Sequence, residues 1–534
     1  MRKTILALAC TAGLGLQAQN VYEIERHSTN DLNGTARFVG MGGAMNALGA
    51  DLSTMTGNPA AIGMYRSSDF ALTASVQAQK GAEKFGDQNK VRGSFDQAGL
   101  VYAFKTYNES LRYFCFGFNY QKMHNLKQFI GSDGWLQLDN DATMLGQLGS
   151  QLYGAAVGFK DDGQWRDYNS VVSNGAYSAG FLDFEKDADG KITDVLVPAK
   201  TESYNYRRAN WGHVNSYNIN LSFNVRDRFY FGLTTSIYDV YSRSLLYHQE
   251  ILQSTPNYSY GLEEETRLYG TGFDMKFGMI VRPVEESPFR FGLAFHTPRI
   301  LSLTQQKWAQ YDIKYDSKYD SKPPIYTDSP KFDLLSTGAY DYNIRTPWRL
   351  QLSAATTVSN WLALDAEYEL AMYNKTAIKY PYYDRFDRPS WVDGNKDLFI
   401  DDEVDYCLRP QHTLRIGMEG RFAEQFYGRI GYNFVSSPFK KDAYLNLAPA
   451  QTSGDYTTVP NSTYEATSTD YINLGNTNRL SLGLGWHGKT AYADVAYVCQ
   501  NQSAEAHAFH DDNLTPIKKD IVRHSVLFTF GVKF

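Results

Sequence analysis

Apolar and polar residues alternate one by one along much of this 534-residue chain. The last ten residues, SVLFTFGVKF, show the pattern most clearly. One face of such a strand carries Val526, Phe528, Phe530, Val532 and Phe534, and the other face is smaller and more polar. A period of two with one apolar face is typical of a strand between lipid and an aqueous lumen. This stretch therefore predicts the closing strand of a membrane β-barrel.

Fourteen segments fit the same period of two. They are residues 70–79, 98–104, 111–120, 217–225, 229–241, 272–281, 289–297, 349–358, 361–370, 413–422, 426–434, 480–486, 492–498 and 525–534. Short turns and long polar segments alternate between them, as periplasmic turns and outer loops do in bacterial barrels. The pattern predicts an all-β protein, a transmembrane antiparallel barrel of about fourteen strands with long extracellular loops, over residues 69–534.

Charged residues also alternate within two of these segments. They are Asp365, Glu367 and Glu369 in one segment and Arg415, Glu419 and Arg421 in the other. A charge facing lipid near the bilayer midplane costs roughly 2–4 kcal/mol, so we expect all six to face the lumen. Structural pairing across the lumen is favoured over a substrate site for these residues.

The amino terminus has the features of a secretory signal. Arg2 and Lys3 precede an apolar run at residues 5–16, and Gln17-Ala18-Gln19 offers a cleavage site. Such a run is too short to span a bilayer as a helix. Residues 1–18 are therefore predicted to be a signal peptide, and a barrel with such a signal is expected in the outer membrane of a Gram-negative cell.

Composition agrees with this class. Aromatic residues make up 15% of the chain, with 39 Tyr and 31 Phe, and the mean hydropathy is −0.43. Barrels need amphipathic aromatic rings at both membrane interfaces. The net charge of −6 argues against a nucleic-acid partner. Outside the signal only Cys115, Cys407 and Cys499 remain, which gives no disulfide framework.

Residues 19–68 do not alternate. Gly, Ala and Met dominate them, and a short helical pattern lies near residues 44–52. Small residues allow close backbone packing, and Met fills irregular apolar gaps. Since a fourteen-strand barrel has a lumen that side chains alone do not fill, these residues are predicted to form a plug, or hatch, inside it.

Several blocks of the chain resemble one known family. Residues 33–44 (NGTARFVGMGGA), 47–51 (ALGAD) and 58–60 (NPA) look like the hatch of FadL/TodX-type outer-membrane transporters. Weaker similarity continues through residues 296–298, 346–348, 429–433 and 494–497. The resemblance implies a passive channel for long-chain fatty acids and other hydrophobic compounds. It also implies that the solute moves from a groove between outer loops to a site beside the hatch. A movement of the hatch then opens an exit, proposed for the family to lie sideways near a kinked strand.

The resemblance points to Asn58, Pro59 and Ala60 as gating residues at the barrel wall. An ordinary turn is the equally weighted alternative, because Asn before Pro favours turn geometry. Gly40, Gly42 and Gly43 are included in the hatch site, with close packing preferred to ligand contact as their role. A monomer surrounded by outer-membrane lipid is expected, with a hydrophobic small molecule as ligand.

Two other interpretations stay open. Haemin uptake would need His, Cys, Met or Tyr as an iron ligand, and the abundance of Tyr neither supports nor excludes it. An adhesive surface barrel would act through its long outer loops. The acidic stretch at residues 185–190 and the pair His507 and His510 are treated as solvated loops, so no metal and no cofactor are expected. Motifs for catalysis are absent from the sequence, so no enzyme is predicted.

Overall fold

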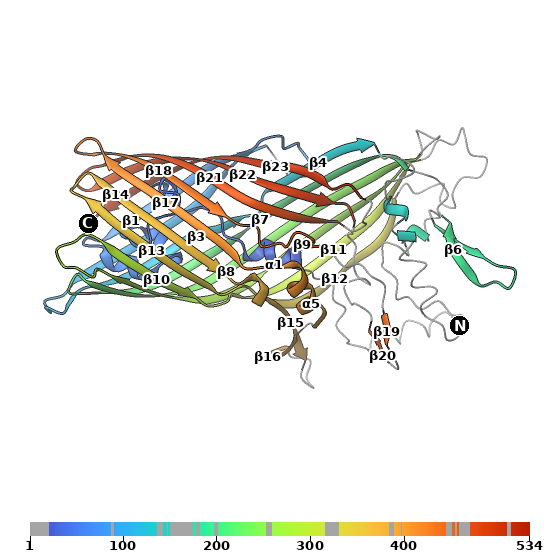
Figure 1. The fold of residues 1–534 in the computed structure, drawn as a ribbon, viewed down its shortest axis with the longest axis horizontal. Coiled ribbons are helices and arrows are strands. Elements are labelled where there is room, and N and C mark those ends of the chain that lie inside the picture. Colours follow the sequence, from blue (N-terminus) through green and yellow to red (C-terminus); the bar gives the residue numbers. More distant parts are fainter. Residues whose placement is uncertain are drawn as a thin grey trace.

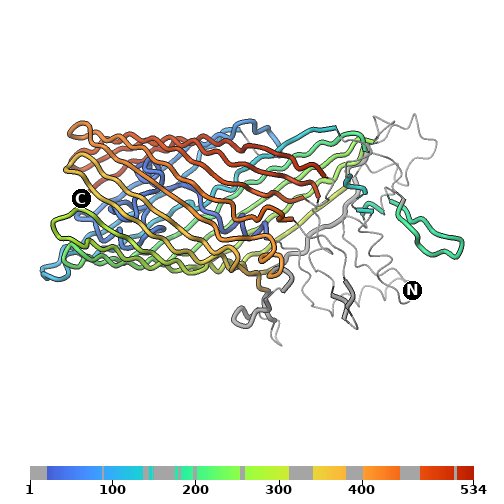
Figure 2. The backbone as a smooth tube through the Cα atoms, viewed as in Figure 1, coloured from blue at the N-terminus to red at the C-terminus, as the bar shows by residue number. Residues whose placement is uncertain are grey.

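The protein is a closed antiparallel β-barrel with its amino-terminal segment inside (Figures 1 and 2). The computed structural model describes residues 21–86, 90–135, 143–146, 148–149, 175–177, 182–196, 201–252, 259–314, 331–383, 389–396, 398–444, 451–453, 456–458, 470–509 and 514–534. The predicted signal peptide lies outside these residues. No helix among the described residues is long and apolar enough to cross a membrane.

Fourteen positions around the wall are occupied within the described chain. Their strands are β1 (Asp69–Gln79), β2 (Val91–Lys105), β3 (Leu111–Asn125) continued by β4 (Gln128–Trp135), β7 (Thr201–Val225), β8 (Phe229–Leu252), β9 (Ser259–Val281), β10 (Arg290–His296) continued by β11 (Ile300–Lys314), β12 (Lys331–Arg345) leading into β13 (Arg349–Val358), β14 (Leu362–Ala371) continued by β15 (Ala377–Tyr383), β17 (Gln411–Arg421), β18 (Phe426–Val435), β21 (Tyr471–His487), β22 (Ala491–His507) and β23 (Ile517–Lys533). β1 pairs with both β2 and β23, which closes the barrel. All fourteen predicted strands are confirmed.

The described chain also contains shorter helices, 3-10 turns and strands. They are the helices α1 (Val21–Ser28), α2 (Ala36–Gly40) and α5 (Leu398–Cys407), the 3-10 turns η1 (Leu52–Thr56), η2 (Pro59–Met64) and η3 (Tyr373–Lys375), and the outer strands β5 (Asp183–Lys186), β6 (Ile192–Leu196), β16 (Pro389–Lys396), β19 (Gln451–Ser453) and β20 (Tyr456–Thr458). The acidic stretch at 185–190 is the turn of the β5–β6 hairpin, where Asp187 Oδ1 accepts the backbone N–H of Asp189 and of Lys191. It is a local turn stabilised by its own side chain.

Several long connections that the sequence predicts as loops are strand. β7 and β8 are 25 and 24 residues long, and β9 extends to Ser259, well beyond the predicted start of its segment at residue 272. The outer face of these extensions carries polar residues such as Arg243, Glu265 and Arg267, because the extensions rise above the lipid and have water outside. The period-two pattern of apolar residues therefore ends where the membrane ends, while the hydrogen-bonded ladder continues.

The outer face of the wall carries a lipid-facing band, and aromatic side chains mark both of its edges. Near the short turns, Phe422, Phe426, Trp486 and Phe534 are exposed. At the other boundary tyrosine hydroxyls bond to polar side chains of the neighbouring strand. These pairs are Tyr368 with His412 (2.7 Å), Tyr432 with Asn478 (2.7 Å) and Tyr497 with His524 (2.8 Å). Aromatic rings with a wet polar end are typical of the membrane–water interface.

Leu482 lies on the outer face of β21 between these two boundaries and is 48% exposed. Leu482→Arg is expected to destabilise the folded barrel by about 2–4 kcal/mol, since the guanidinium would face lipid. The matched variant Asn501→Arg places the same side chain on the outer face of β22, above Tyr497. It is expected to change the stability by less than about 0.5 kcal/mol. Urea unfolding in lipid vesicles measures both, and equal effects would contradict this assignment of the lipid band.

Candidate functional site

The amino-terminal segment, residues 21–68, lies within the lumen and bonds to many wall strands (Figure 2). It descends from α1, near the middle of the barrel, to Asp69 at the end with the short turns. The helix predicted near residues 44–52 is wrong: the chain there forms turns, and the helices lie at α1, α2, η1 and η2.

The reason for this difference is a pair of carboxylates on β14. Glu367 Oε1 accepts the backbone N–H groups of Met45 (2.8 Å) and Asn46 (2.7 Å). Asp365 Oδ2 accepts those of Ala47 (3.1 Å) and Leu48 (2.9 Å). Four successive N–H groups thus bond to the wall instead of to helical carbonyls. Both acids face the lumen as predicted, but the sequence gives no local signal that they bind the backbone of residues 45–48.

Ion pairs between arginines and carboxylates bind the segment to the wall at a second place. Arg37 in α2 donates from Nη2 and Nε to the two oxygens of Glu419 on β17, at 2.7 and 2.9 Å. Arg429 on β18 donates to the same carboxylate (2.6 Å) and to Asp494 on β22 (2.5 Å). The predicted inward charge of Glu419 is confirmed. Arg421, by contrast, lies at the short-turn end, where its guanidinium donates to a backbone carbonyl and is exposed.

Asn58, Pro59 and Ala60 lie against the wall, at the start of η2. Asn58 caps this turn by accepting the N–H of Ala60 (3.1 Å) and donates through Nδ2 to the carbonyl of Met279 on β9 (3.3 Å). The carbonyl of Pro59 accepts a hydrogen bond from Ser222 Oγ on β7 (2.8 Å). The three residues are therefore both a capped turn and a docking point on the barrel.

Three glycines make room for this docking point, and we call them the wall notch: Gly232 of β8, Gly278 of β9 and Gly292 of β10. A Cβ at Gly232 would lie 2.3 Å from the carbonyl carbon of Pro59. At Gly278 it would lie 2.1 Å from Asn58 Oδ1, and at Gly292 2.9 Å from Asn58 Nδ2. Only residues without a side chain permit so close an approach of two backbones.

The other predicted hatch residues, Gly40, Gly42 and Gly43, also lie in close contacts. A Cβ on Gly40 would lie 3.2 Å from the Cα of Gly483, and one on Gly42 would lie 2.8 Å from the backbone nitrogen of Tyr432. Gly43 has a φ of +82°, a conformation that suits glycine. None of the three lines the cavity described next.

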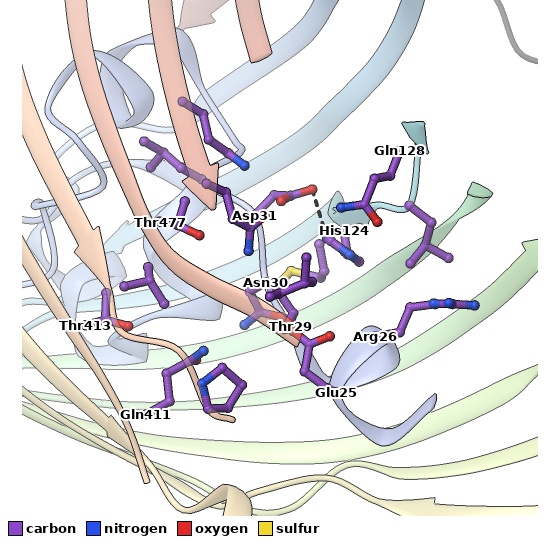
Figure 3. Close-up of a pocket in the computed structure, with 18 of the residues that line it drawn as sticks. Glu25, Arg26, Thr29, Asn30, Asp31, His124, Gln128, Gln411, Thr413 and Thr477 are labelled. Carbon is purple, nitrogen blue, oxygen red and sulfur yellow. Dashed lines mark hydrogen bonds and ion pairs between the residues drawn. The ribbon is translucent and has the colours of Figure 1, made fainter. Parts of the chain in front are cut away.

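A cavity of about 180 Å³, here called the outer cavity, lies on the side of residues 29–57 that faces away from the short turns (Figure 3). α1 contributes Glu25 and Arg26, and the wall contributes side chains such as Gln128 and Gln411. Eleven Asn and Gln residues and thirteen Asp, Glu, Lys and Arg residues line it, far more than its apolar lining residues. The outer cavity is therefore a polar chamber within the lumen.

Asp31 is the acidic centre of the chamber. Its Oδ2 lies 3.0 Å from His124 Nδ1 and accepts the backbone N–H of Asn125 (2.8 Å) (Figure 3). Burial opposes its charge, but the positive fields of His124, Arg523 and Arg479 prevail and hold the pKa of Asp31 below its ordinary value. Asp31 is therefore a fixed negative charge with its own partners.

Outward of this chamber a hydrophobic cluster occupies part of the lumen, with the buried Glu250 bonded to its members Met144 and Tyr260. On β7, β8, β9 and β11 the chamber is lined by Arg208, Ser244, Glu264 and Lys307, and the next inward residues away from the short turns are hydrophobic. They include Tyr206, Leu246, Leu262 and Ala309, and they pack with Met144, Leu145 and Phe509 in one cluster, here called the mouth cluster. A second small chamber, lined by Arg37, Asp51 and Lys533 among others, lies on the opposite side of the segment, near the short turns.

No family model and no curated protein matches the chain. It is similar in structure to a Pseudomonas aeruginosa FadL homologue (14% identity, 95% of this chain and 99% of that one, TM-score 0.48). It is likewise similar to the Ralstonia pickettii toluene transporter TbuX (12%, 94% and 99%, 0.47) and to the monoaromatic hydrocarbon channel CymD (10%, 95% and 99%, 0.47). At such identities the likeness concerns the fold, and the function has to be argued from the site.

Gly278→Ala tests the wall notch. Its methyl group would displace Asn58, so we expect the amides of residues 58–64 to exchange with deuterium at least several-fold faster while the barrel strands stay protected. Gly420→Ala is the matched control, because a Cβ there has nothing within 4 Å. Mass-spectrometric hydrogen exchange in detergent measures both variants, and unchanged exchange in Gly278→Ala would contradict the docking role.

Proposed function

We propose that this protein is an outer-membrane channel for the passive uptake of hydrophobic small molecules such as long-chain fatty acids, gated by its amino-terminal segment acting as a hatch. The observation that carries the proposal is the order of environments along the lumen: an apolar mouth cluster, a chamber, and then a segment that is bonded to the wall. A solute entering from outside first meets apolar contacts, which are worth roughly 25 cal/mol per Å² of buried area before ordering costs.

The wall also offers a candidate exit beside the hatch. β2 and β3 pair only from Gln97 with Gln121 to Lys105 with Tyr113, although β2 begins at Val91. Beyond this ladder, side chains bridge the two strands, with Lys122 Nζ donating to Ser94 Oγ (2.6 Å).

A residue of the hatch takes part in this bridge. Asn33 Nδ2 donates both to Asp96 Oδ1 (3.1 Å) and to the carbonyl of Lys122 (3.1 Å). Side-chain bonds open at less cost than a backbone ladder, because fewer bonds must break together. We therefore assign the sideways exit to this place, with Asn33 linking its opening to movement of the hatch.

Haemin uptake is the less favoured function. Of the two histidines that line the outer cavity, His124 faces Asp31 at 3.0 Å and His296 Nε2 lies 2.6 Å from the carbonyl of Gly57. Both ring systems are therefore engaged in holding the amino-terminal segment to the wall. Iron ligation by either would first have to break such a contact.

A disulfide between the hatch and the wall tests whether movement of the hatch gates the channel. A Cβ on Gly63 of η2 would lie 3.6 Å from the Cβ of Ser222 on β7, which suits a disulfide. Gly63→Cys with Ser222→Cys, in a chain whose Cys115, Cys407 and Cys499 are replaced by alanine, would fix the hatch. We expect oxidation to abolish the uptake of labelled oleate into cells that lack another fatty-acid channel, and a reductant to restore it.

Each single cysteine variant is the control for this lock, and haemin is supplied in parallel. Uptake that is unaffected by oxidation would overturn gating by the hatch. Uptake of haemin but not oleate would overturn the assigned substrate class. Equal amounts of folded protein in the outer membrane are verified for every variant by heat-dependent gel mobility.

A further inference from the structure

The outer cavity is unlike a pore for bare hydrocarbons, because almost every wall strand that faces it contributes a polar side chain. Among the described residues eleven side-chain amides line it, and each has both donor and acceptor groups, although several of these bond within the protein. An apolar molecule in this chamber would strip water from these groups without replacing their hydrogen bonds, which costs free energy for every group involved. The chamber therefore suits the polar end of a solute.

The arginines that line the chamber indicate the charge of the polar end of the solute. Arg208 pairs with Asp470, and Arg415 pairs with Glu369 at 2.9 Å. Arg479 donates to Gln500 (2.8 Å) and to Asn433 (2.9 Å). These arginines are held by the protein itself and are part of its framework.

Arg523 of β23 differs from them. Its side chain lines the chamber and is 6% exposed, yet its guanidinium has no hydrogen-bond or ion-pair partner among the described residues, and its Nε is a buried donor without an acceptor. Asp31 is the acid that interacts with it electrostatically, but that carboxylate is occupied by His124 and the backbone of Asn125. An uncompensated buried cation is costly unless an anion is brought to it.

A second orphaned group in the lining is an acceptor. Gln351 of β13 donates through Nε2 to Glu367 (2.8 Å), while its buried Oε1 has no donor among the described residues. Among the described residues, the lining thus includes a guanidinium without a hydrogen-bond partner, Arg523, and an amide oxygen without a donor, Gln351 Oε1, on strands from different parts of the wall. A ligand that satisfies both needs a negative charge and, separately, an N–H or O–H donor.

We propose that the outer cavity binds the head group of an amphiphile that is anionic and carries a further hydrogen-bond donor, as in an N-acyl amino acid, with Arg523 as its charge-binding residue. The mouth cluster receives the acyl chain. This inference rests on the proposed channel for its setting and narrows its substrate class. A simple hydrocarbon leaves both orphaned groups unmatched, and a simple fatty acid leaves the amide oxygen unmatched.

Three probes with the same acyl chain test the proposal on the full-length protein in lipid nanodiscs. N-lauroylglycine has the charge and the amide, laurate has only the charge, and N-lauroylglycinamide has only the amides. Isothermal titration calorimetry is expected to give the tightest binding for N-lauroylglycine, by about tenfold over each of the others, or about 1.4 kcal/mol. Equal affinity for laurate and N-lauroylglycine overturns the proposal.

Arg523→Gln removes the charge and leaves a shorter polar side chain whose amide can still donate hydrogen bonds. It is expected to weaken N-lauroylglycine about tenfold while leaving N-lauroylglycinamide unchanged, and Arg523→Lys is expected to keep most of the affinity. Lys518→Gln removes a charge from the same strand outside the chamber, where the side chain is 72% exposed, and should change nothing. Loss of affinity for the neutral and the charged probe alike, or for neither, overturns the role of Arg523.

These outcomes are separable from those of the hatch experiment. Binding in nanodiscs requires no transport, so a chain that binds N-lauroylglycine but fails in oleate uptake keeps the head-group site and loses the channel. A chain with oxidation-sensitive uptake but no preference among the three probes keeps the channel and loses the head-group site. Heat-dependent gel mobility again reports whether each Arg523 variant is folded.

Discussion

The width of the lumen is the constraint from which the rest of this structure follows. A barrel of fourteen strands has more interior than inward side chains can fill, so a length of polypeptide must enter it. That polypeptide brings backbone N–H and C=O groups which cannot all bond to each other in turns, and each buried group left unpaired is costly. The wall supplies the missing partners, above all through Asp365 and Glu367, which bind four successive N–H groups.

A wall that binds a segment this way must also let it approach. Charged side chains on β14 and β17 bond to the segment, while glycines on β8, β9 and β10 leave a hollow for Asn58 and Pro59. The segment is therefore held by two means, long polar contacts and close backbone contact.

Much of the wall was predictable from the sequence because a period of two is enforced wherever one face meets lipid. The inward placement of Asp365, Glu367 and Glu419 followed from the same rule. The conformation of residues 44–48 did not, because Ala44, Ala47 and Leu48 have good helix propensity and the acids that override it lie more than 300 positions away in the chain. The strand extensions of β7 to β9 were missed for a related reason, since water outside them removes the apolar signal from their outer face.

The sequence also could not distinguish a paired lumen charge from an unpaired one. Arg479 and Arg523 are both inward arginines in strands near the carboxy terminus, and nothing in their local sequence separates them. In the folded barrel Gln500 and Asn433 bind the first, whereas the second has no such partner in the part of the chain that the structure describes. A framework residue is one whose partners come from the protein, and a binding residue is one whose partner is still missing. By that criterion the proposed channel would select its solute in the polar chamber rather than at the mouth, since apolar contact accepts any hydrophobic chain and a guanidinium without a partner favours an anion.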